Sequence, residues 1–125
     1  MSLLSTIINI LFGNENRTIL YALISLVVLD YTTGLCVAIR QRKLSSSIGS
    51  KGIVGKVMVF IMVSLSHIVD KYLLPSGAAL ESITILFYST NEIISILENA
   101  SKIGIPFPEK LVTHLKAFND KQKKS

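Results

Sequence analysis

The sequence predicts an all-α membrane protein with three transmembrane helices. Half of its 125 residues are hydrophobic and only 17% are charged, whereas charged residues make up about a quarter of a typical soluble domain. The charges are also clustered, which leaves three long segments almost free of them. A soluble chain of this length has too little other sequence to cover three such segments. We therefore expect residues 1–125 to form a single membrane domain.

Residues 1–13 are expected to form a short amphipathic helix. Apolar residues recur at helical spacing from Leu3 to Phe12, and polar residues such as Asn9 form a narrow stripe between them. A helix of this length is too short to span a bilayer. It is expected either to lie in the membrane interface or to pack against the other helices.

The predicted spans are residues 18–39, 53–74 and 77–97. Each has about the 20 residues needed to cross a hydrocarbon core of roughly 30 Å. Proline and glycine at 75–77 separate the second span from the third. Residues 98–125 are expected to form a tail, in which a short helix of about ten residues precedes a run of lysines.

The distribution of lysine and arginine predicts the orientation of the chain. Residues 40–52 form a basic loop between the first two spans, and the tail after the third span is also rich in lysine. The residues that we expect to determine topology are Arg40, Arg42, Lys43, Lys51 and Lys56. With three spans both basic regions lie on one side of the membrane, and this side is expected to be the cytoplasm. The N-terminus is then outside and the C-terminus inside.

Asp30 is the deepest charge in the first predicted span. It lies beside Thr33 and Gly34, and small residues allow helices to approach closely. An acid at the centre of a bilayer costs about 2.5–3.5 kcal/mol on insertion scales, so it usually faces protein or water. Two interpretations remain open. Asp30 is protonated or pairs with Lys56 as a packing device, or it faces a water-filled path or an oligomer interface.

The third predicted span carries a row of polar residues at alternating spacings of three and four. The row, with Glu92 beside it, consists of Glu81, Thr84, Tyr88, Asn91, Ser95 and Glu98. Such a stripe is hard to satisfy in lipid, because each unpaired polar group there costs free energy. We expect it to be buried against other helices, within one chain or between chains, or to line water in an assembly. The alternative is that this helix lies in the interface and does not span.

No catalytic, cofactor-binding or metal-binding residues are predicted. The segment GSKGIVGK superficially resembles a phosphate-binding loop, but Ser50 and Val57 stand where that motif requires glycine and Ser/Thr. His67 and His114 have no metal-ligand spacing. The net charge of +5 suits an anionic membrane surface better than nucleic acid, because no basic module with interleaved aromatic residues is present.

The sequence resembles the phage lysis and toxin-secretion holin family, which includes clostridial toxin-release holins. Three blocks carry the resemblance: DYTTGLCVAIRQRKLSSSIGSKGIVGK (30–56), the Ile68-Val69-Asp70 region, and FYSTNEIISILENASKIGIPFPEKL (87–111). The third block is the most specific, because it carries the Asn-Glu, Ser-Ile-x-Glu-Asn and Gly-x-Pro-x-Pro elements of the family. Together the blocks cover most of residues 20–115.

The resemblance implies a phage or prophage protein of the bacterial inner membrane. Such a protein oligomerises with itself in the lipid and forms nonspecific lesions at a set time. The lesions release an endolysin or a large toxin, which would be the functional partner. The alternative functions are a small ion channel or transporter accessory subunit, which needs a narrow selectivity site, and a scaffold protein with no permeability of its own.

Overall fold

The computed structural model describes residues 2–43, 45–74, 79–106 and 108–124, and every regular element in these ranges is helical. The elements are α1 (Leu3–Phe12), α2 (Arg17–Arg40), α3 (Ser46–Ile68), the π-helical turn η1 (Val69–Leu73), α4 (Leu80–Ile103) and α5 (Glu109–Lys124). The turn η1 continues α3 without a break.

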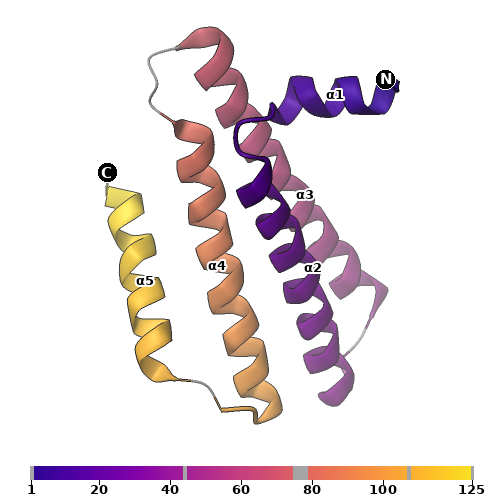
Figure 1. Ribbon diagram of the computed structural model, residues 1–125. Coiled ribbons are helices and arrows are strands. Elements are labelled where there is room, and N and C mark those ends of the chain that lie inside the picture. The colour runs from indigo at the N-terminus through magenta and orange to yellow at the C-terminus, as the bar shows by residue number, and fades with distance from the viewer. Residues whose placement is uncertain (1, 44, 75–78, 107, 125) are drawn as a thin grey trace.

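Helices α2, α3 and α4 lie side by side with alternating direction (Figure 1). Helix α1 stands across one end of this bundle and contacts α3, and α5 runs back along α4. Helix α4 therefore contacts α2, α3 and α5, and its contact with α2 is the most extensive in the protein. Its central position makes α4 the element on which the bundle depends.

The apolar core lies where the three long helices meet. It consists of Leu20, Leu23 and Val27 from α2, Val63 from α3 and Ile85 from α4. This core is small, because only 28% of the most apolar part of α2 and 11% of that of Gly49–Leu73 is buried inside the protein. The apolar side chains on the outside of α2 and α3 form a surface suited to lipid.

Two segments, Arg17–Arg40 and Gly49–Leu73, are long and apolar enough to cross a membrane. The first coincides with the first predicted span. Helix α4 covers most of the third predicted span, 77–97, but it is not among the candidates found in the described part of the chain. Its carboxylates and amides lower its mean hydropathy. The structure thus supports an all-helical fold with two candidate spans and one short apolar helix, and the count of three spans is not confirmed.

The second long helix begins at Ser46, earlier than the predicted start at residue 53. Hydropathy does not reveal this extension, because residues 46–52 are rich in serine and glycine. Gly49 and Gly52 lie against the ring of Tyr31 on α2, whose hydroxyl donates to the Gly49 carbonyl at 3.3 Å. A Cβ at either glycine would come within 3.2 Å of that side chain. The extension is therefore stabilised by tertiary contact.

Two other predictions concern the links between helices. The break predicted at residues 75–77 lies outside the described residues. The C-terminal helix was expected to be short, but α5 continues to Lys124, so it includes the lysines assigned to the tail. The chain therefore ends in a helix of 16 residues that packs on α4.

Asp70 in η1 caps the first turn of α4. Its Oδ1 accepts a hydrogen bond from the Leu80 amide at 3.0 Å, and its Oδ2 accepts one from the Glu81 amide at 2.8 Å. Asp70→Ala is expected to destabilise the first turn of α4 by about 1 kcal/mol, as loss of a cap does elsewhere. Hydrogen exchange should be faster at these two amides, and Asp70→Asn should retain part of the protection. Unchanged exchange in the alanine variant would contradict the capping role.

Candidate functional site

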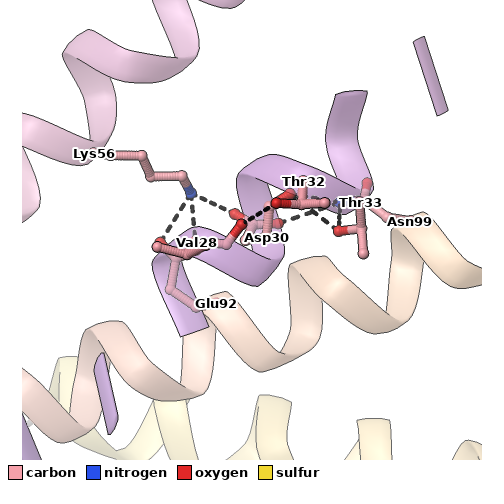
Figure 2. A network of polar contacts seen from close by, with 7 residues as sticks. All are labelled: Val28, Asp30, Thr32, Thr33, Lys56, Glu92 and Asn99. Atoms are coloured by element: carbon pink, nitrogen blue, oxygen red, sulfur yellow. Dashed lines mark hydrogen bonds and ion pairs between the residues drawn. The ribbon is translucent and has the colours of Figure 1, made fainter. Parts of the chain in front are cut away.

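Three charged side chains meet near the middle of the bundle, one from each long helix. Asp30 of α2, Lys56 of α3 and Glu92 of α4 form what we call the central charge cluster (Figure 2). The Lys56 Nζ donates to Glu92 Oε1 at 2.9 Å and Oε2 at 2.8 Å, and it also donates to Asp30 Oδ2. Asp30 and Glu92 are only 6% and 5% exposed. The cluster therefore links all three helices through a single ammonium group.

The central charge cluster contains two carboxylates and one ammonium. With all three groups ionised it carries one negative charge, and an unpaired charge is costly away from water. Asn99 of α4 reduces this cost, because its amide donates to Asp30 Oδ1 at 3.2 Å and to Thr33 Oγ1 at 2.9 Å. The acids are thus satisfied within one chain, but by a geometry that depends on all three helices.

A pocket of about 260 Å³ reaches the cluster from between α2, α3 and α4. Asp30, Lys56 and Asn99 line it, together with Gly34 and Gly52. A Cβ at Gly34 would lie 3.8 Å from the Asn99 amide nitrogen, which is ordinary van der Waals contact, so this wall of the pocket also has room for a small side chain. The cluster therefore borders a pocket between the helices, while its two carboxylates stay almost fully buried.

The structure brings together some of the residues singled out from the sequence. Asp30 pairs with Lys56, as the packing interpretation proposed, and Thr33 accepts from the same Asn99 that contacts Asp30. The contact of Glu92 with Lys56 and the role of Asn99 were not predicted. A signal for Asn99 was present, because it follows Glu92 by seven residues and so lies on the same helix face.

The polar row on α4 does not face a single neighbour. Thr84 shares a hydrogen bond of 2.7 Å with Ser66 on α3, whereas Asn91 and Glu98 contact α5. The two ends of the row, Glu81 and Glu98, are 17 positions apart, so at about 100° per residue they point roughly 100° apart. Alternating spacings of three and four therefore turn the row from the interior of the bundle towards α5.

A second polar group, the Glu81 cluster, lies at the end of the bundle near α1. Glu81 Oε1 accepts from the Asn16 amide at 2.9 Å and lies 3.2 Å from His67 Nδ1. Glu81 and His67 are only 2% and 3% exposed. Gly13 has a φ of +67° and lies against the His67 ring, where any side chain would collide. This cluster joins the residue before α2 to α3 and α4 through Glu81 Oε1, whereas Glu81 Oε2 and His67 Nε2 are buried without a hydrogen-bond partner among the described residues.

Comparisons with known proteins show the family of the chain. The bacteriophage holin family matches residues 6–120, which is nearly the whole chain. The chain belongs to the bacteriophage holin family. A probable holin of Bacillus phage phi105 is 32% identical over 70% of this chain and 64% of its own length.

Other relatives are more similar in sequence. An uncharacterised protein of Halalkalibacterium halodurans is 39% identical over 88% of this chain and 84% of its own length. An uncharacterised 14.9 kDa protein of Clostridium perfringens is 33% identical over 95% of this chain and 89% of its own length. No solved structure matches the chain. Membership of a holin family assigns the chain to the membrane proteins and not to the enzymes.

Proposed function

We propose that this holin-family chain oligomerises in the bacterial inner membrane and forms nonspecific lesions. The lesions let a cytoplasmic endolysin, or a large toxin, leave the cell. Family membership over residues 6–120 supports this role. The observation that carries the mechanism is the central charge cluster, because it places three ionisable groups in the middle of a bundle whose outer surface is apolar.

The central charge cluster supports two states of the protein. In the single chain, Lys56 satisfies Asp30 and Glu92, so the apolar outer surface can remain in lipid. In an assembly, the same groups turn towards water, where hydration replaces the contacts within the chain. Asn91 and Glu92, with the neighbouring polar residues of α4, then contribute to a hydrated face of the lesion. Separating the charged groups of the cluster costs little free energy once water hydrates them, so assembly acts as the trigger of lesion formation.

We further propose three spans, with α4 as the third, an outer N-terminus and a cytoplasmic C-terminus. The support is the basic segment at the end of α2 and start of α3, which this topology places on the same side as the lysines of α5. With Cys36→Ser as background, Ser2→Cys should react with a membrane-impermeant maleimide in intact cells. Ser125→Cys should react only after permeabilisation. Labelling of both ends from the same side would mean an even number of spans.

The proposed function predicts abrupt loss of membrane potential when the chain is expressed in a bacterium. Cells should lyse only when they also contain a cytoplasmic endolysin that lacks an export signal, and the endolysin alone should cause neither effect. Membrane potential and turbidity are recorded together. Depolarisation without endolysin-dependent lysis would instead indicate a small channel, and unchanged potential would indicate a scaffold protein.

A further inference from the structure

Helix α5 is hydrophilic, yet it packs along α4 (Figure 1). Its residue Asn119 is only 4% exposed, and the Asn119 amide donates a hydrogen bond to Asn91 Oδ1. An exposed ion pair, Lys116 Nζ to Glu98 Oε1 at 3.5 Å, lies beside this contact. Asn91 lies near the middle of α4, so α5 covers one face of that helix to about half its length.

This position of α5 is incompatible with a lipid-embedded α4. Helix α5 contains five lysines and two acids in 16 residues, and such a helix is strongly disfavoured in the hydrocarbon core. Our proposed function has α4 as a span, so α5 must leave that face when α4 is in the bilayer. Gly104, in the left-handed region at φ +98°, ends α4, and the prolines at 106 and 108 prevent the two helices from merging.

Departure of α5 leaves the Asn91 amide without its partner. Asn119 is the hydrogen-bond partner that Asn91 has among the described residues. Asparagine within a membrane helix is commonly satisfied by a polar group on a neighbouring helix. Ile94, one helical turn from Asn91, is 9% exposed, so the same side of α4 also carries apolar surface. This composition suits contact with another helix.

The contact between Asn91 and α5 indicates which group can take the place of Asn119. It joins two asparagine amides, and each amide has both a donor and an acceptor. Only one of the two possible hydrogen bonds forms, since Asn119 Oδ1 is buried without a partner. Two copies of Asn91 related by a twofold axis present the same pair of groups symmetrically and can exchange both hydrogen bonds. A second copy of the chain therefore offers a better partner than α5.

We propose that the face of α4 around Asn91 is a docking surface for the same face of a second copy, and that α5 occupies this face in the single chain until α4 enters the bilayer. This inference rests on the proposed function only in requiring α4 to be a span. It assigns the surface through which two copies first associate, and it makes α5 an intramolecular competitor of that association.

Oxidative cross-linking in membranes tests the docking surface. In a Cys36→Ser background, Ile94→Cys reports on the proposed face while Asn91 stays intact. Ile93→Cys is the control, at the same depth but about 100° around the helix. We expect Ile94→Cys to give at least fivefold more disulfide-linked dimer than Ile93→Cys. Adding Asn91→Leu should reduce this to the control level, whereas Asn91→Gln, which keeps the amide, should retain at least half.

The competition by α5 is tested with Asn119→Ala in the Ile94→Cys chain. Loss of the contact favours the form in which α4 is embedded in lipid, so it should raise the dimer yield at least twofold at equal expression. Equal yields from Ile94→Cys and Ile93→Cys would overturn the docking surface, and an unchanged yield in Asn119→Ala would overturn the competition. Dimer formation without depolarisation would support the docking surface and contradict the proposed lesion-forming function. Depolarisation without a dimer at Ile94→Cys would overturn the docking surface and leave the lesion-forming function standing.

Discussion

Lys56→Met is expected to destabilise the three-helix bundle by about 3–5 kcal/mol, because it leaves two buried carboxylates without their cation. Lys56 is the group that holds both Asp30 and Glu92 in the central charge cluster. The free energy of unfolding is measured in detergent micelles by titration with a denaturing detergent. In cells the variant should accumulate poorly and should not depolarise the membrane.

The control is the triple variant that removes the charge without changing the shape, Lys56→Met with Asp30→Asn and Glu92→Gln. It should recover most of the lost stability, since no ionised group then remains unpaired. Glu92→Gln alone should be mild, because it leaves Asp30 and Lys56 as a neutral pair. If Lys56→Met were as stable as the triple variant, the cluster would not hold the bundle together.

Leu23→Ala is expected to cost about 2–5 kcal/mol in the same titration, as large-to-small changes do in packed cores. The Leu23 side chain is completely buried where α2 meets Val63 of α3 and Ile85 of α4. Truncation leaves a cavity that the surrounding helices fill only in part. The loss is one of packing, which persists in detergent and in lipid.

Leu29→Ala is the matched control for Leu23→Ala. Leu29 lies on the same helix but is 51% exposed, on the surface that we assign to lipid. Its truncation should change the free energy of unfolding by no more than about 0.5 kcal/mol. Equal effects of the two substitutions would mean that the three helices do not pack as the structure shows.

The helical fold could be predicted from the sequence because its signals are local. Long apolar segments and the charges that bound them indicate α2, and the periodicity from Leu3 to Phe12 indicates α1. The start of α3 at Ser46 could not be predicted in this way, because it depends on Tyr31 packing on two glycines of another helix. The prediction of α4 as a span rested on its length and on the apolar residues between its polar ones, whereas its mean hydropathy is too low for it to be among the candidate spans.

The site was predictable only in part, because its geometry depends on the rotation of each helix about its axis. Asp30 and Glu92 stood out as charges in apolar surroundings, and Lys56 was recognised as a possible partner of Asp30. That one lysine binds both acids depends on how α3 faces α4, and no spacing within a single helix reveals it. The return of α5 along α4 was not predicted either, although Val112, Leu115 and Asn119 have helical spacing on one face.

The central claim, that this chain alone forms a hole large enough for a folded enzyme, is tested most directly with purified protein in lipid vesicles. The vesicles contain a small dye and a fluorescent folded protein, and the efflux of both is followed as the protein-to-lipid ratio increases. The account predicts that dye and folded protein leave together above a threshold ratio, with neither leaving below it. Efflux of the dye while the folded protein stays inside at every ratio would contradict it.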